Sequence, residues 1–196
     1  MAADAHEPAA PGVWVQDLHH SHPGVTCAVS EALCEAASVC LDRHHESPKE
    51  FSLDCDGDTS KLSLYWQQSS AYAKAAHGYE HDATKEGAYA LSLLCVENHL
   101  GLVAAGQAAG GTGADWYITR PENVQIDADG FPNLDVPEIY RLEVSGVNRG
   151  PIGGRLTKKT EQLDKPESEI PGIAAVVGFE RAAVRIKRAG NAGGSL

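Results

Sequence analysis

Two carboxylates in apolar runs are the residues of this chain best suited to chemistry. Asp115 stands in the run Gly-Ala-Asp-Trp-Tyr-Ile at residues 113–118, and Glu143 stands in Tyr-Arg-Leu-Glu-Val-Ser-Gly at residues 140–146. If these runs are neighbouring strands, the two acids converge at one end of a sheet, where they can hold a hard divalent cation for phosphodiester cleavage. The alternative is that each strand presents one solvated acid.

Glu86 is a third candidate acid, on the helix expected from Tyr79 to Leu100. Gly87 follows it, and a glycine is unfavourable inside a helix unless another group must approach closely. We therefore consider Glu86 a candidate to complete or orient a metal site. The alternative is that the helix begins at Thr84 and Glu86 is an ordinary first-turn acid, where negative charge is favourable.

Hydrophobic periodicity predicts the elements that position these acids. The long helix should end at Gly101, and a short amphipathic helix is expected over residues 155–164. The order helix, strand, strand, strand, helix, strand, strand predicts an α/β domain. Residues 119–138 contain three prolines and an Asp-Gly pair, which indicate an inserted hairpin or loop. The expected strands are residues 102–105, 115–118, 139–147, 173–179 and 183–187.

Length and composition predict one domain with two loose ends. A chain of 196 residues with 42% hydrophobic residues can bury one core comfortably. Residues 1–24 lack periodicity and predict a flexible arm that docks at most through Val13, Trp14 and Val15, and residues 189–196 predict a flexible tail. The expected domain spans residues 25–188, with an extension over 25–78 and the core over 79–188.

The extension is expected to contain one helix and one hairpin. An apolar stripe from Val29 to Leu41 predicts a helix that begins near Thr26 or Ser30. Alternating apolar residues on both sides of an Asp-Gly pair at 56–57 predict a β-hairpin over residues 51–66.

Other residues of metal-ligand type have poor spacing. Asp54, Asp56 and Asp58 invite a calcium interpretation, but Tyr65 stands where a calcium loop has its glutamate, so an acidic hairpin turn is favoured. The histidines at 19, 20, 22, 44 and 45 match no structural zinc spacing. We expect neither a calcium nor a zinc site.

The net charge of −11 is unevenly distributed. Residues 1–100 hold 5 Lys and Arg against 15 Asp and Glu, whereas residues 141–196 hold 10 against 6. A basic end on an acidic body allows local contact with nucleic acid but opposes the non-specific phosphate binding of a free-standing DNA-binding protein. We therefore expect protein partner subunits to help hold DNA.

The cysteines and the apolar runs indicate the compartment. The five cysteines are odd in number, lie in apolar stretches and form no Cys-x-x-Cys pair, which predicts buried thiols in a reducing environment. The N-terminus lacks the pattern of a signal peptide, and no apolar run approaches the length of a membrane span. These features predict a cytoplasmic protein that does not associate with a membrane.

The order of elements and acids resembles the core of the PD-(D/E)xK nuclease superfamily, which includes type II restriction enzymes and archaeal Holliday-junction resolvases. In that superfamily a helix supplies a glutamate, one strand an aspartate, and the next strand an acid-x-lysine pair. Glu86, Asp115 and Glu143 match these three acids over roughly residues 79–188. The resemblance implies a restriction-endonuclease-like core, a central mixed β-sheet flanked by helices, and Mg²⁺ bound by Asp115 and Glu143.

The chain departs from the superfamily at Ser145, which stands where the lysine is expected. That lysine would orient the attacking water and offset negative charge at the transition state. Lys158 or Lys159 on the helix at 155–164 can replace it, with Ser145 and Gln162 positioning water or phosphate. One side of this helix carries Arg155, Lys158, Lys159 and Gln162, at the spacing i, i+3, i+4 and i+7. The alternative is that the basic side is a solvated helix face.

Two shorter motifs, at residues 111–117 and 141–146, resemble more closely an uncharacterised bacterial family with Gly-Thr-Gly-x-Asp-Tyr-Trp and Arg-Leu-Glu-Val-Ser-Gly. This resemblance implies no established activity. That family is basic in the segment before its aspartate, whereas residues 107–111 of this chain have no basic residue. Phosphate contact there would fall to glycine N–H groups, the alternative being simple turn flexibility.

The sequence thus predicts an Mg²⁺-dependent nuclease that cleaves DNA within a bacterial multi-protein defence or DNA-processing assembly. The alternative is a nuclease-like fold without catalysis that serves as a protein-interaction or assembly module, which Ser145 and the net charge favour. A small-molecule-binding domain has no motif in its support. The oligomeric state is left open, a homo-oligomer included.

Overall fold

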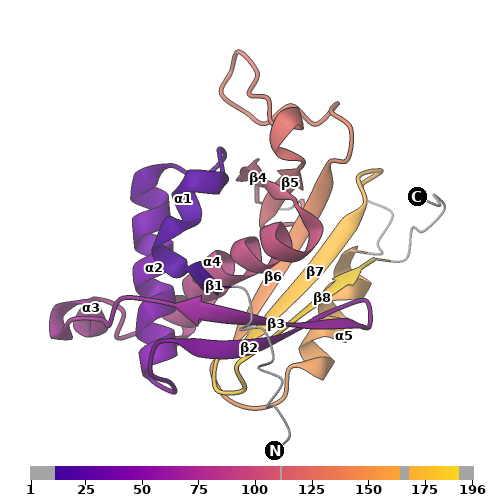
Figure 1. Ribbon diagram of the computed structural model, residues 1–196. Helices are drawn as coiled ribbons and strands as arrows, with labels where there is room; N and C mark the ends of the chain where they lie inside the picture. Colours follow the sequence, from indigo (N-terminus) through magenta and orange to yellow (C-terminus); the bar gives the residue numbers. More distant parts are fainter. Residues whose placement is uncertain (1–11, 111, 164–167, 190–196) are drawn as a thin grey trace, which may run out of the picture.

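The computed structural model describes residues 12–110, 112–163 and 168–189. They form an α/β protein in which an eight-stranded mixed sheet packs against five α-helices (Figure 1). The strand order is β1-β3-β2-β8-β7-β6-β5-β4. The ends of the expected arm and tail, at 1–11 and 190–196, lie outside the described residues, as do Gly111 and Asp164.

The bounds of the elements follow the expected order closely. The strands are β1 (Gly12–Trp14), β2 (Lys49–Cys55), β3 (Asp58–Tyr65), β4 (Val103–Gln107), β5 (Trp116–Thr119), β6 (Tyr140–Val147), β7 (Gly172–Gly178) and β8 (Ala183–Arg188). The α-helices are α1 (Leu18–Ser21), α2 (Cys27–Asp42), α3 (Ala71–Ala76), α4 (Glu80–Leu100) and α5 (Gly153–Leu163). The hairpin, the long helix and the short amphipathic helix are therefore confirmed.

Strand β6 occupies the position that matters most for the candidate site. It pairs antiparallel with β5 and parallel with β7. The β5–β6 ladder ends where Trp116 pairs with Leu142, whereas the β6–β7 ladder continues to Val147. Beyond Leu142, β6 therefore presents backbone groups toward the side that β5 has left.

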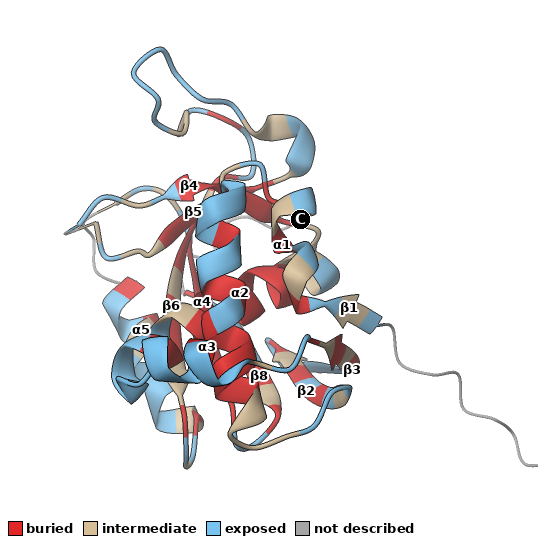
Figure 2. Cartoon of the chain, turned by 90° about the vertical axis from the view of Figure 1, so that its left-hand side faces the viewer, coloured by how far each residue is buried: buried red, intermediate tan, exposed pale blue. Residues whose placement is uncertain are grey.

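The two faces of the sheet carry different helices. Helices α2 and α4 cover one face, and α5 lies on the other (Figure 1). Leu142 and Val144 of β6 belong to the main core, while Glu143 between them contacts α5, as the alternation of a strand requires. Buried residues are concentrated in the sheet, α2 and α4, whereas α3 and α5 are largely exposed (Figure 2).

The start of α2 and the end of α4 follow from their sequences. The side chain of Thr26 caps α2 by accepting a hydrogen bond from the N–H of Val29. Helix α4 ends at Gly101, whose φ of 66° is the left-handed conformation that a glycine adopts without strain.

Residues 12–24 differ from the loose arm expected of them. Strand β1 pairs in parallel with β3, and a short 3₁₀-helix and α1 follow it. Val15 and Leu18 are fully buried, and so is His22. These segments are three or four residues long, too short to show a hydrophobic period, so composition alone indicated disorder. Helix α3, six residues long, was also not expected.

The insertion at residues 119–138 forms the irregular segment that its prolines indicated. It contains a 3₁₀-helix, η2 (Pro121–Asn123), and an isolated bridge between Ile126 and Pro132. A small apolar cluster, which includes Tyr117 and Val136, packs beneath it. The segment projects from the top of the molecule in Figure 1.

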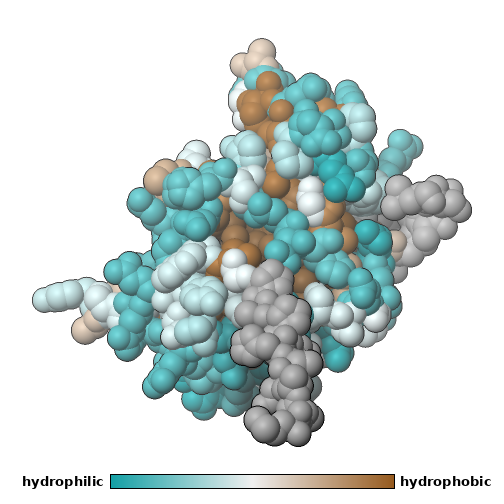
Figure 3. Space-filling model, viewed as in Figure 1, coloured by the Kyte–Doolittle hydropathy of each residue, from teal (hydrophilic) through white to brown (hydrophobic). Residues whose placement is uncertain are grey.

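The outer surface is mostly polar on the face that Figure 3 presents. Hydrophilic residues cover most of this face, and apolar residues reach the surface mainly at its centre and in its upper part. In the part of the chain that the structure describes, no helix combines the length and apolar character needed to cross a membrane.

Close backbone contacts explain two glycines near the candidate site. A Cβ added to Gly87 would lie 2.9 Å from Cα of Ala37, so this glycine lets α4 pack tightly against α2. A Cβ added to Gly146 would lie 2.3 Å from the carbonyl oxygen of Thr84, so β6 and α4 also meet backbone to backbone. The group that approaches Gly87 is thus a neighbouring helix.

We predict that Gly146→Ala destabilises the protein. The added methyl group meets a backbone carbonyl that cannot rotate away, so the free energy of unfolding should fall by about 1–3 kcal/mol. Gly154→Ala on α5 is the matched control, because a Cβ there meets nothing within 4 Å and should leave stability equal or slightly higher. Urea unfolding followed by circular dichroism measures both, and equal midpoints would contradict the close contact.

Candidate active site

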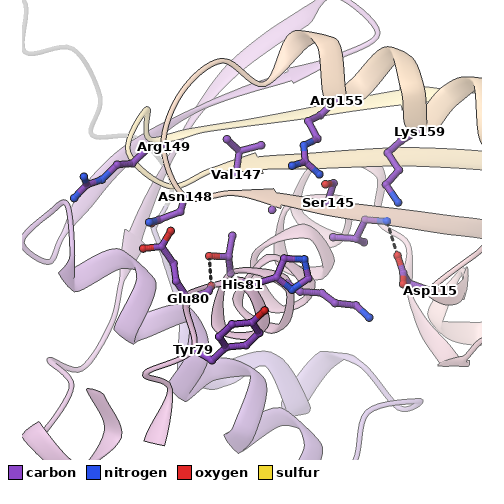
Figure 4. A pocket seen from close by; sticks show the side chains of 14 residues that line it. Tyr79, Glu80, His81, Asp115, Ser145, Val147, Asn148, Arg149, Arg155 and Lys159 are labelled. Atoms are coloured by element: carbon purple, nitrogen blue, oxygen red, sulfur yellow. Dashed lines mark hydrogen bonds between the residues drawn. The ribbon is translucent and has the colours of Figure 1, made fainter. Parts of the chain in front are cut away.

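A cleft of about 720 Å³ opens between the start of α4, the second half of β6 and α5 (Figure 4). Helix α4 and the residue before it contribute one wall, and α5 contributes the opposite one. Arg155 and Lys159 extend from α5 toward Ser145 and Asp115, with Tyr79 on the other side. The residues that line the cleft are Tyr79, Glu80, His81, Thr84, Lys85, Asp115, Val144, Ser145, Gly146, Val147, Asn148, Arg149, Arg155 and Lys159.

Asp115 is held in place by two hydrogen bonds to its carboxylate. Its Oδ2 accepts from the N–H of Val144 at 2.8 Å, and its Oδ1 accepts from the hydroxyl of Tyr89 at 2.5 Å. The first donor is available because β5 stops pairing with β6 at Leu142. Asp115 therefore occupies the position beside β6 that β5 leaves open.

Glu143 lies beside Asp115 and is paired with a lysine. The Nζ of Lys159 donates a hydrogen bond to Oε1 of Glu143. The side chains are only 12% and 23% exposed for Glu143 and Lys159 respectively, so solvent screens this pair weakly. The structure thus brings Asp115, Glu143 and Lys159 together from a loop, a strand and a helix.

Burial raises the pKa of Glu143 above its usual value of 4.5. The hydrogen bond from Lys159 acts in the opposite direction, and the negative charge of Asp115 raises the pKa further. The two carboxylates are therefore close enough to interact. An acid whose ionisation is opposed by a neighbouring negative charge favours a positive group beside it.

Tyr89 supports the site from α4. Its ring makes an edge-to-face contact with Trp116, with centroids 6.1 Å apart. Burial and the bond to Asp115 raise the pKa of its hydroxyl, so the tyrosine remains a hydrogen-bond donor at neutral pH. Sequence analysis missed Tyr89, although it lies one helical turn after Glu86 within a run of small and apolar residues.

A buried arginine sets the position of α5. Arg141 on β6 is 3% exposed and donates to the carbonyl oxygens of Ile170 and Leu163, the latter the last residue of α5. These bonds tie the helix end to the strand that bears Glu143. Lys159 therefore reaches Glu143 from a helix whose position the same strand determines.

The other predicted site residues are distributed unevenly. Ser145 is 8% exposed and lines the cleft. Lys158 and Gln162 are exposed on α5 and do not line the cleft. Leu156 and Leu163, on the opposite side of the helix, pack in an apolar cluster against the sheet.

Glu86 does not line the cleft either. Its Oε2 lies 3.8 Å from Nδ1 of His77, and its side chain is 44% exposed. Since α4 begins at Glu80, Glu86 is in the second turn and the first-turn interpretation does not apply. The structure therefore gives Glu86 a histidine partner and no contact with Asp115 or Glu143 among the described residues.

The two carboxylates suit Mg²⁺, which keeps water or substrate oxygens as ligands, better than a metal ion whose ligands all come from the protein. Asp115 and Glu143 offer hard carboxylate oxygens, and Mg²⁺ is commonly bound by one or two carboxylates with water and substrate phosphates completing its shell. Within the residues described, no group of three or more His, Cys, Asp or Glu side chains is placed to hold a metal ion. A site at these two acids therefore depends on water or substrate for its other ligands.

Thiol chemistry and a calcium site have little structural support. Burial raises the pKa of Cys40 to about 11 and that of Cys95 to about 12, so these thiols stay protonated. Cys27 is exposed, contrary to the expectation that all five are buried.

In the hairpin, Asp54 and Asp56 each lie 3.6 Å from an arginine of β8, which supports the interpretation of this segment as an acidic turn.

Comparison of the chain with models of protein families, with curated proteins and with solved structures gave no match. The resemblance to the nuclease superfamily therefore remains a prediction from the sequence motifs.

We predict that the pKa of Glu143 responds in opposite directions to changes in its two neighbours. Asp115→Asn should lower the pKa, because it removes a negative charge, and Lys159→Met should raise it, because it removes the stabilising donor. Carboxyl-carbon NMR titration measures both shifts. Because the folded-state pKa is raised, the stability contributed by protonated Glu143 is present below pH 4.5 and is lost as the pH rises through the folded-state value. Shifts of the same sign would contradict the geometry.

Proposed function

We propose that this protein is an Mg²⁺-dependent nuclease that cleaves DNA phosphodiester bonds. The observation that supports this most directly is the contact of Lys159 with Glu143 beside Asp115. It reproduces the combination of two acids and one lysine of the PD-(D/E)xK superfamily, with the lysine supplied by α5 because Ser145 occupies its usual position.

Asp115 and Glu143 would hold Mg²⁺, which supplies Lewis-acid stabilisation of the charge that develops on the phosphate. Lys159 would offset negative charge at the same phosphate and help to orient water. Ser145, which lines the cleft, would position water or phosphate by a hydrogen bond. Tyr89 would act as a positioning residue through its bond to Asp115.

The topology is compatible with a restriction-endonuclease-like core. A long helix packs on one face of a mixed sheet, the acids lie on adjoining segments, and a further helix covers the other face. The roles that the sequence predicts for Glu86, Lys158 and Gln162 receive less support, because none of these side chains lines the cleft. Lys159 is therefore the lysine that we assign to catalysis.

The net charge of −11 supports action within a larger assembly. An acidic body repels the DNA backbone, so partner subunits or a second copy of the chain would supply the additional phosphate contacts. We propose a role in a bacterial defence or DNA-processing assembly.

A nuclease fold without catalysis, acting as an assembly module, is the second candidate. Ser145 in the lysine position and the acidic surface favour it. In that case the cleft would bind nucleic acid or a partner without cleaving it. Measurements of cleavage and of metal binding distinguish the two candidates.

We predict metal-dependent cleavage of plasmid DNA by the purified protein. Asp115→Asn, Glu143→Gln and Lys159→Met should each reduce the rate at least about 100-fold, because each removes a group that stabilises the transition state. Gel analysis of plasmid conversion with added MgCl₂ or EDTA measures the rate.

The matched controls are Asp129→Asn, Glu161→Gln and Lys187→Met, which make the same chemical changes at exposed positions away from the cleft. These variants should retain the activity of the unmodified protein. Absence of cleavage by the unmodified protein, with binding of metal and DNA retained, would favour the assembly module.

We also predict that Mg²⁺ stabilises the folded protein through the two acids. At a concentration of about ten times its Kd, the cation adds roughly 1.4 kcal/mol to the free energy of unfolding, which raises Tm by about 3–6 °C. Differential scanning fluorimetry should show this shift in the unmodified protein and in Asp129→Asn but not in Asp115→Asn. An undiminished shift in Asp115→Asn would place the metal elsewhere.

A further inference from the structure

Three positive side chains line the cleft without a carboxylate partner. Lys85, Arg149 and Arg155 are exposed, and none of them forms an ion pair among the described residues. The only contact described for the Lys85 ammonium is with the ring of Tyr89, 5.6 Å from its centroid. On a protein whose net charge is −11, unpaired cations gathered around one cleft indicate an anionic ligand.

An exposed aromatic ring lies at the same cleft. Tyr79 immediately precedes α4, is 70% exposed, and has its ring centroid 6.1 Å from that of His81, which also lines the cleft. In Figure 4 these two rings face the side from which Arg155 and Lys159 extend. A large exposed ring and unpaired cations along one cleft can together bind bases by stacking and phosphates by charge.

The combination favours unpaired over duplex nucleic acid. Bases within a duplex are stacked on each other, so an isolated tyrosine ring can stack only on a base that is unpaired or at an end. Duplex affinity depends on contacts with many phosphates, and an acidic protein with three free cations at its cleft offers few. Stacking of a base on Tyr79 compensates for the small number of phosphate contacts only when the DNA is single-stranded.

We propose that the cleft binds an unpaired stretch of DNA, with a base stacked on Tyr79 and adjoining phosphates on Lys85, Arg149 and Arg155. This proposal rests on the proposed function for its substrate, DNA, and names the form of DNA that enters the site. The strand would then run from the start of α4 toward Asp115 and Glu143. A nuclease of this kind acts on flaps, ends or melted regions.

Fluorescence anisotropy with a labelled oligothymidylate of about twelve nucleotides tests the proposal, in EDTA so that no cleavage occurs. The unmodified protein should bind this strand at least about tenfold more tightly than a labelled duplex of the same length. Tyr79→Ala should weaken binding of the single strand roughly tenfold and leave duplex binding unchanged, while Tyr79→Phe, which keeps the ring, should bind normally.

Tyr72→Ala is the matched control for the ring, because Tyr72 is 87% exposed and does not line the cleft. Arg155→Gln should make the log–log dependence of affinity on salt shallower by about 0.7. Arg188→Gln, which makes the same charge change on β8 outside the cleft, should not.

Equal affinity for strand and duplex, or equal effects of Tyr79→Ala and Tyr72→Ala, would overturn the proposal. Equal or tighter binding of an oligouridylate would overturn the assignment to DNA. Because binding is measured without metal, this test is independent of catalysis. If the protein prefers single-stranded DNA through Tyr79 but cleaves no DNA, the proposed nuclease activity is refuted while the proposed single-strand binding site is supported.

Discussion

The candidate site depends on the early end of one β-ladder. Because β5 begins at Trp116 and its pairing with β6 stops at Leu142, the N–H of Val144 has no strand partner on that side. A buried donor without a partner is costly, and the carboxylate of Asp115 satisfies it at 2.8 Å. The same bond that completes the sheet therefore fixes an acid next to Glu143.

Placing two acids side by side in a half-buried position creates an electrostatic cost that the surroundings must offset. Burial and the negative charge of Asp115 raise the pKa of Glu143, and the ammonium group of Lys159 opposes that effect. The hydroxyl of Tyr89 and the N–H of Val144 provide further positive dipoles for Asp115. Their combination leaves a site that a divalent cation or a phosphate beside Lys159 can complete.

The sequence predicted the parts of this arrangement that depend on local pattern. Periodicity identified the long elements, and the i, i+4 spacing placed Arg155 and Lys159 on one side of α5, where both line the cleft. The bond between Tyr89 and Asp115 joins residues 26 positions apart, and no local pattern encodes such a contact. The contact of Glu86 with His77, which precedes the helix, is likewise not encoded in the helical pattern around Glu86.

The backbone contact between Gly146 and Thr84 connects recognition with chemistry. It holds the start of α4, with Tyr79 and Lys85, against the strand that bears Glu143, so the α4 wall of the cleft and this strand belong to one packed unit. Half-burying two carboxylates and leaving cations unpaired around them both cost free energy when nothing is bound. A ligand with phosphates would compensate for both costs at once, and this is the physical reason for proposing nucleic acid as the ligand of the cleft.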